Sequence, residues 1–165
     1  MSSPNLKRSF PPVVDEHVRV LVLGSLPGEE SLARAQYYAH PRNHFWTLMG
    51  EVLGTELVAL RYDERLRALL ARRVGLWDTV ESASRRGSLD GAIRGHCAND
   101  LQTLATSLPE LRCIAFNGGT SARIGEKQLG GASPFERLRL PSSSPAYTLP
   151  FDEKLEAWLQ LRTYL

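Results

Sequence analysis

The residues of this 165-residue chain that could carry out chemistry lie in a few short polar segments. The first, Gly24-Ser-Leu-Pro-Gly28, lacks both the Gly-Lys-Ser/Thr of a phosphate loop and the Gly-x-Gly-x-x-Gly of a dinucleotide site. The chain has no Gly-x-Ser-x-Gly turn, so a Ser-His-Asp hydrolase is not indicated. Around His40, His44 and His96 we find no carboxylate or thiol in a metal-ligand motif, and we therefore expect no metal and no cofactor.

A second segment, Tyr37-Tyr-Ala-His-Pro-Arg-Asn-His-Phe-Trp46, is the most distinctive in the chain. It combines an aromatic pair, a proline turn and an asparagine. Asn43 stands one or two residues before an apolar helical pattern, where an N-cap belongs. The two tyrosines could equally be core aromatics.

Further polar candidates follow short apolar runs. Asp78 and Asn117 could each be ordinary cap or turn residues, and Ser142, Ser143 and Ser144 could form a plain loop. Their interest depends on whether the fold brings them together.

The hydrophobic periodicity predicts the elements that must position these residues. Near-continuous apolar runs indicate buried strands, and apolar residues spaced three and four apart indicate helices with one buried face. The expected strands cover residues 18–24, 74–77, 113–116 and 137–140, and the expected helices cover residues 45–53, 62–70, 101–108, 120–129 and 151–159.

This alternation predicts an α/β fold with three layers, in which a central four-stranded parallel sheet is covered by helices on both faces. In such sheets the ligand site lies beyond the carboxyl ends of the strands. Four polar segments should meet there. They are residues 24–28, 77–82, 117–120 and 141–146.

Length and composition favour one ordinary domain. We expect an N-terminal arm over residues 1–12 and a single domain over residues 13–165. No apolar run approaches the roughly 20 residues that a membrane span needs, and no signal core is visible at the start. We expect a monomer. Because the chain has only two cysteines, we expect it in the reducing cytoplasm.

The basic residues are lopsided, with 17 arginines against 3 lysines. Arginine suits bidentate contacts to phosphate, although a GC-rich genome explains the ratio equally well. Arg85 and Arg86 are the best local candidates for phosphate contacts, while a solvated face is as good an explanation.

Three motifs taken together resemble those of the uracil-DNA glycosylase superfamily. They are Gly24-Ser-x-Pro-Gly28, Ala39-His-Pro-x-Asn43-x-Phe-Trp46 and Leu140-Pro-Ser-Ser-Ser-Pro145. The second is shared with the mismatch-specific uracil/thymine branch. With Leu76-Trp-Asp78 and Phe116-Asn-Gly118 added, the set looks most like the hypoxanthine-DNA (deoxyinosine) glycosylase branch.

The resemblance implies a monofunctional DNA glycosylase of base excision repair, with DNA containing a deaminated base as its partner. The enzyme would flip the base, expected to be hypoxanthine, out of DNA and hydrolyse its N-glycosidic bond. Asn43 would be catalytic by orienting water, and Tyr38 would stack on the base. The expected substrate-binding residues are Gly24, Ser25, Leu26, Pro27, Tyr38, Asp78, Phe116 and Asn117, and the expected DNA-binding residues are Arg42, Arg85, Arg86, Ser142, Ser143 and Ser144.

Two positions depart from the uracil-directed relatives. Leu26 stands where those relatives carry a water-positioning Asp or Asn, and Leu140 stands where several carry a histidine. Both departures fit the hypoxanthine branch, in which the Asp78 carboxylate could accept the N1–H of hypoxanthine. A uracil or G·T/U mismatch glycosylase is the closest alternative. A non-catalytic nucleic-acid or nucleotide-binding module is the alternative of another class.

Water is the expected nucleophile. Lys7, Lys127 and Lys154 all fall outside the predicted site loops, so a Schiff-base step has no obvious agent.

Overall fold

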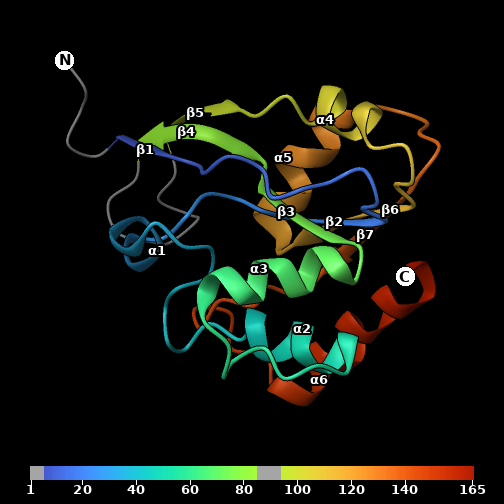
Figure 1. Cartoon of the computed structure of the whole chain (residues 1–165). Coiled ribbons are helices and arrows are strands. Elements are labelled where there is room, and N and C mark those ends of the chain that lie inside the picture. Colours follow the sequence, from blue (N-terminus) through green and yellow to red (C-terminus); the bar gives the residue numbers. More distant parts are fainter. Residues whose placement is uncertain (1–5, 85–93) are drawn as a thin grey trace.

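A four-stranded parallel sheet organises the structure, which is a computed structural model describing residues 6–84 and 94–165 (Figure 1). Its strands are β2 (Val20–Gly24), β3 (Val74–Asp78), β6 (Cys113–Asn117) and β7 (Glu136–Leu140), in the spatial order β3-β2-β6-β7. Every neighbouring pair is parallel. The two central strands are buried along their whole length, as expected for a sheet covered on both faces.

Helices cover both faces of this sheet, which confirms the predicted three-layer α/β/α architecture (Figure 1). Val20 and Val22 of β2 point into one core, which the helices α2, α3 and α6 share, and Leu21 and Leu23 point into the other, against α4 and α5. The bounds are α2 (Phe45–Leu53), α3 (Tyr62–Ala71), α4 (Leu101–Ser107), α5 (Gly119–Leu129) and α6 (Phe151–Trp158), followed by the 3-10 helix η2 (Leu159–Tyr164). Among the described residues, none of the helices is long and apolar enough to cross a membrane.

The strand register places the polar candidates in one row. Gly24 pairs with Asp78 across β2 and β3, and Asn117 pairs with Leu140 across β6 and β7. The carboxyl ends of all four strands therefore meet at one edge, as predicted.

A second sheet was not expected. It has three antiparallel strands in the order β1-β4-β5, with bounds β1 (Leu6–Arg8), β4 (Val80–Ser84) and β5 (Arg94–Ala98). β1 lies within the segment proposed as an arm, and β4 overlaps the segment of residues 77–82 that was expected to be a loop. Both strands are short, and β1 pairs with residues more than 70 positions away, so local periodicity gives little sign of them. The helix α1 (Glu29–Arg34), largely polar, was also missed.

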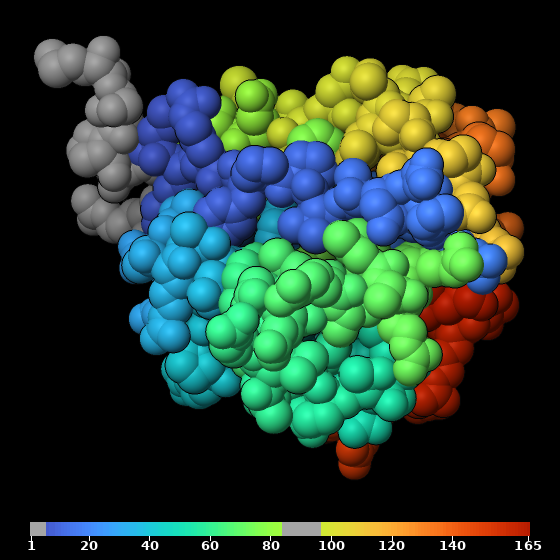
Figure 2. Space-filling view, viewed as in Figure 1, coloured from blue at the N-terminus to red at the C-terminus, as the bar shows by residue number. Residues whose placement is uncertain are grey.

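The N-terminal segment continues from β1 across the molecule and closes the β3 edge of the main sheet. Val13 forms an antiparallel bridge with Leu76, and Trp77 donates its indole N–H to the carbonyl of Phe10 at 3.0 Å. Figure 2 shows this segment as a blue band between α3 (green) and α4 (yellow). The segment thus seals the boundary between the two helical layers.

Close packing under α5 generates a stability prediction. An added Cβ at Gly125 would lie 2.2 Å from Cε1 of the buried Phe116 ring, so Gly125→Ala should cost about 1–3 kcal/mol of unfolding free energy despite its better helix propensity. Chemical denaturation would measure this. Gly131→Ala, where a Cβ meets nothing within 4 Å, is the matched control and should change stability by less than about 0.5 kcal/mol. Equal stabilities of the two variants would contradict the packing argument.

Candidate active site

A cavity of about 1160 Å³ opens at the carboxyl edge of the parallel sheet. All four segments predicted to meet there contribute to it, and the segment leading into α2 adds a further wall. Its lining includes Gly24, Ser25, Leu26, Pro27, Tyr38, His40, Arg42, Asn43, Asp78, Asn117, Ser142, Ser143, Ser144 and Tyr147.

The floor of the cavity depends on Gly24, because glycine has no side chain. A Cβ at this position would lie 2.6 Å from Oδ1 of Asp78 and 2.9 Å from the hydroxyl of Tyr38. Only glycine lets both polar groups approach the β2 backbone this closely. Asp78 is 3% exposed, and its carbonyl accepts a hydrogen bond at 2.8 Å from Nδ2 of the buried Asn99. The Asp78 backbone is therefore held firmly beneath the cavity.

The two adjacent tyrosines have different surroundings. Tyr37 is buried, and its hydroxyl donates to the carbonyl of Pro11 at 3.1 Å. Burial, with the charge of Asp78 adding to it, raises the pKa of Tyr37 well above its usual range, so its hydroxyl stays neutral. Tyr38 is half-buried and stacks on Phe45, with ring centroids 4.0 Å apart and planes 21° apart. Both line the cavity, but Tyr37 is anchored mainly as a core residue.

A tight turn presents Asn43. The backbone N–H of Asn43 donates to the carbonyl of His40 at 2.9 Å and closes a β-turn. Pro41 is the second residue of this turn, a position where β-turns favour proline. Nδ1 of His40 accepts from the amide of Arg42 at 3.1 Å, so a neutral His40 ring carries its hydrogen on Nε2. The turn thereby fixes the donor nitrogen of a histidine on the cavity wall.

Asn43 also makes the capping contact that its position predicts. Its Oδ1 accepts from the backbone N–H of Phe45 at 2.9 Å, although the N-cap residue of α2 is His44, one position later. Because only the oxygen can accept this hydrogen, the contact orients the amide and places Nδ2 on its other side. Asn43 lines the cavity at the same time, so capping and a chemical role are compatible.

Two hydrogen bonds hold the serine loop, which is the segment of residues 141–146 after β7. Nδ2 of Asn117 donates to Oγ of Ser143, and the backbone N–H of Ser143 donates to Oδ1 of Asn117, both at 2.9 Å. The carbonyl of Ser143 in turn accepts from the amide of His44 at 3.0 Å. The side chain of Asn117 is thus engaged at both ends and ties together β6, the serine loop and the start of α2.

The serine loop turns through local contacts of its own. Oγ of Ser142 accepts from the amide of Ser144 at 3.1 Å, and Oγ of Ser144 accepts from the amide of Ala146 at 3.2 Å. Gly118 has a φ of +99° and would place a Cβ 3.1 Å from that of Ser142, so this position requires glycine. Ser143, at 1% exposure, serves the loop's architecture, whereas Ser142 and Ser144 remain partly exposed.

Sequence reasoning missed Lys154, which lies behind this loop, and its neighbour Tyr147. Lys154 of α6 is only 1% exposed, and its Nζ donates to the carbonyl of Ser144 at 3.2 Å and lies 5.5 Å from the ring centre of Tyr147. Desolvation lowers the pKa of Lys154. The available signal was its place on the apolar face of α6, three residues after Phe151 and four before Trp158.

Of the remaining predicted site residues, some line the cavity and others pack behind it. Leu26 is buried against Val80 and Ile124, and it brings no polar side chain to its own position in the first loop. Phe116 does not line the cavity, since its ring packs against α5 on the other face of the sheet. Arg85 and Arg86 lie outside the described residues. In the part of the chain that the structure describes, no three His, Cys, Asp or Glu side chains are grouped to hold a metal.

This chain belongs to the uracil DNA glycosylase superfamily, whose family model matches residues 11–162. It is 43% identical to a hypoxanthine DNA glycosylase of Methanosarcina acetivorans over 141 residues, which are 86% of this chain and 88% of the relative. It is 36% identical to a hypoxanthine DNA glycosylase of Methanosarcina barkeri over 154 residues, covering 93% of this chain and 96% of that one.

A solved structure is similar over nearly the whole chain. The solution NMR structure of a candidate uracil DNA glycosylase from Methanosarcina acetivorans superposes with a TM-score of 0.84 at 37% identity. The match covers 96% of this chain and 98% of that one. The fold is therefore that of this superfamily.

Lys154 yields a prediction about charge. Its buried ammonium forms no ion pair with a carboxylate among the described residues, so a phosphate of bound DNA is the expected counter-charge. Lys154→Met should weaken DNA binding and make the slope of log affinity against log salt shallower by about one unit. Fluorescence anisotropy over a salt series would measure this.

The control for that experiment is Lys127→Met, which removes an exposed lysine from α5. It should leave the slope unchanged. If Lys154→Met keeps the wild-type slope while remaining folded by circular dichroism, its charge has no part in binding DNA.

Proposed function

We propose that this chain is a monofunctional hypoxanthine DNA glycosylase of base excision repair. The observation that carries the proposal is the sequence identity of 43% and 36% to two relatives of that name, over at least 86% of this chain. The cavity lined by Asn43, Tyr38 and Asp78 supports it. The enzyme acts as a monomer in the cytoplasm on DNA that contains deaminated adenine.

The flipped base enters the cavity at the sheet edge and stacks on Tyr38. Phe45 supports that ring from one side and holds it as a rigid surface for a flat heterocycle. The Asp78 carboxylate accepts the N1–H of hypoxanthine. Adenine has an acceptor at N1, so the same carboxylate disfavours the undamaged base.

Asn43 holds the attacking water. Its Oδ1 has one lone pair occupied by the Phe45 amide, which leaves the second lone pair and the Nδ2 hydrogens to orient a water molecule. An amide is not a strong base, but breaking the glycosidic bond leaves the bonding electron pair on the base and develops an oxocarbenium-like sugar. A positioned water can capture this sugar while it loses a proton to the solvent. Nε2–H of His40, on the cavity wall, is the donor that stabilises the departing base.

The loop from Ser142 to Tyr147 contacts the DNA strand. The partly exposed Ser142 and Ser144 offer hydroxyls to phosphate, and Arg42 offers an exposed guanidinium at the cavity wall. Tyr147 is 47% exposed at the rim and is large enough to fill the space that the flipped base leaves in the duplex.

A uracil or mismatch glycosylase of the same fold is the competing function, and the candidate uracil DNA glycosylase at 37% identity is the observation that favours it. Two apolar positions oppose it, because the buried Leu26 and Leu140 supply no polar group for water or for uracil O2. Labelled duplexes carrying hypoxanthine, uracil, xanthine or a G·T mismatch distinguish the functions. Fastest single-turnover release of hypoxanthine supports the proposal, whereas preferred release of uracil or thymine rejects it.

Substitution of Asn43 separates chemistry from capping. Asn43→Ala should lose about 1 kcal/mol of stability and a factor of about one hundred or more in single-turnover cleavage. Asn43→Ser keeps an oxygen that can accept from the Phe45 amide, so it should regain stability but not activity. A folded Asn43→Ser enzyme that cleaves at a near-native rate would show that another group holds the water.

Chelation tests the metal-free mechanism. Because an amide and not an ion is proposed to position the water, activity in excess EDTA should equal that in buffer alone. The check is initial cleavage rate before and after EDTA, followed by added Mg²⁺ or Zn²⁺. A loss that either ion restores would contradict the mechanism.

A further inference from the structure

A row of arginines borders the opposite edge of the parallel sheet. Arg73, Arg19 and Arg112 each directly precede one of the neighbouring strands β3, β2 and β6. Their backbones are joined, since the amide of Arg19 donates to the carbonyl of Arg73 and the amide of Arg112 to that of Arg19, both at 2.8 Å. Five-residue strands separate this row from the catalytic edge by about 15 Å.

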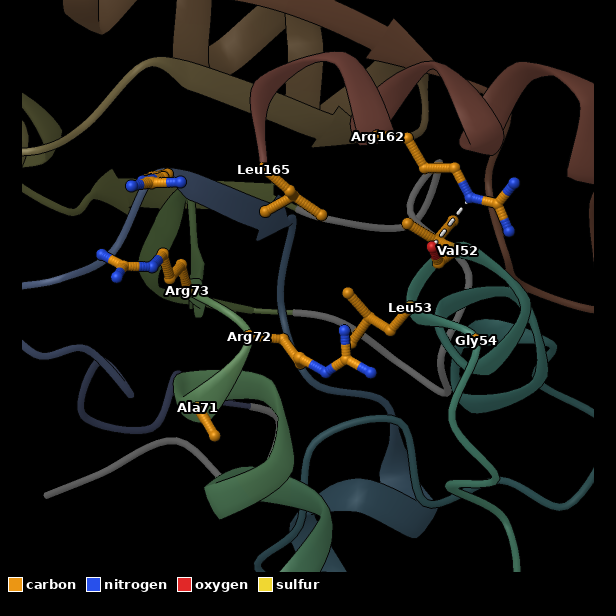
Figure 3. A pocket seen from close by; sticks show the side chains of 9 residues that line it. Val52, Leu53, Gly54, Ala71, Arg72, Arg73, Arg162 and Leu165 are labelled. Atoms are coloured by element: carbon orange, nitrogen blue, oxygen red, sulfur yellow. Dashed lines mark hydrogen bonds between the residues drawn. The ribbon is translucent and has the colours of Figure 1, made fainter.

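A hollow of about 460 Å³ lies beside this row. Four arginines contribute to it, namely Arg19, Arg72, Arg73 and Arg162, and no acidic residue of the described chain does. Figure 3 shows Arg72 extending between Ala71 and Leu53, with Arg162 and Leu165 on the other side of the hollow. The chain therefore concentrates like charges in a concave surface.

Two of these arginines have structural partners that account for them. Nε of Arg162 donates to the carbonyl of Val52 at 2.9 Å and so satisfies the end of α2. Nη1 of Arg73 lies 3.5 Å from Oε2 of Glu110, which also bonds the His17 ring at 3.0 Å. Glu110 is thus shared between Arg73 and His17, and no acidic residue of the described chain lines the hollow itself.

The other two arginines retain donors without protein partners. Arg72 uses Nη2 on the hydroxyl of Thr55 at 3.1 Å, and no other side-chain bond of Arg72 is found among the described residues. Nε of Arg19 is buried and has no hydrogen-bond partner in the described part of the chain. Burial lowers the pKa of Arg19, and the charges of Arg112 and Arg73 add to this effect. A buried donor among like charges is costly unless an anion completes it.

We propose that this hollow binds a compact oligophosphate, with two or three linked phosphate groups, at a site separate from the catalytic cavity. Guanidinium groups pair with phosphate oxygens in bidentate fashion, and an oligophosphate carries enough negative charge to balance several of them. The hollow lies at the opposite edge of the sheet from the catalytic cavity, about 15 Å away along the strands. A second duplex would need an open cationic stripe, whereas this surface is concave.

Isothermal titration of the full chain with sodium tripolyphosphate tests the proposal, with sulfate at matched ionic strength as the comparison. We expect one bound tripolyphosphate per chain, and a rise in melting temperature that sulfate does not match. Arg72→Gln alone should weaken binding about tenfold, and Arg19→Gln with Arg72→Gln should weaken it further. Cleavage of damaged DNA without tripolyphosphate should be unchanged in these variants.

The matched control is Arg123→Gln, which removes an exposed arginine from α5, away from the hollow. It should bind tripolyphosphate as the wild type does. Equal weakening by Arg123→Gln, no excess over sulfate, or displacement of tripolyphosphate by DNA carrying the damaged base would each overturn the proposal. Loss of binding to undamaged duplex DNA alone in the Arg19 and Arg72 variants would assign the hollow to a second DNA segment instead.

Discussion

Parallel pairing of four short strands is the constraint on which the rest of the structure depends. Because β2, β3, β6 and β7 run in one direction, their carboxyl ends share an edge, and Gly24, Asp78 and Asn117 fall in one row there. Helices on both faces make the strands inaccessible, so polar groups can meet a ligand only where the strands end. The location of the cavity follows from this pairing, and its chemistry follows from the residues that end each strand.

Polar groups buried at this edge must be satisfied, and the contacts that satisfy them also shape the site. Asn117 and Ser143 exchange two hydrogen bonds, and Asn43 completes the first turn of α2. Each contact lowers the cost of burying an amide or hydroxyl, and each fixes a side chain or loop beside the cavity. Stability and preorganisation are therefore supplied by the same bonds, with the packing of Gly24 under Tyr38 and Asp78 as their steric counterpart.

Basic side chains lie at both edges of the sheet, but their arrangement differs between the two edges. At the carboxyl edge, the buried Lys154 supports the serine loop from behind, and the exposed Arg42 lines the cavity. At the amino edge, arginines at the starts of neighbouring strands gather around a smaller hollow. The small net charge of +2 conceals this arrangement, because acidic residues balance the sum. Asp78, Glu29 and Glu30 line the cavity at the carboxyl edge, whereas no acidic residue of the described chain lines the hollow at the amino edge.

The sequence by itself determined the strands and helices of the main layers, since a buried strand and an amphipathic helix each have a local period. It also placed Asn43 at a helix start and the glycine, aspartate and serine loops at one edge. Tertiary structure alone decided which tyrosine is anchored in the core and that Phe116 faces α5. It alone formed β1 with β4, whose pairing spans more than 70 residues. These features depend on which distant surfaces meet, and no local pattern of residue types encodes that contact.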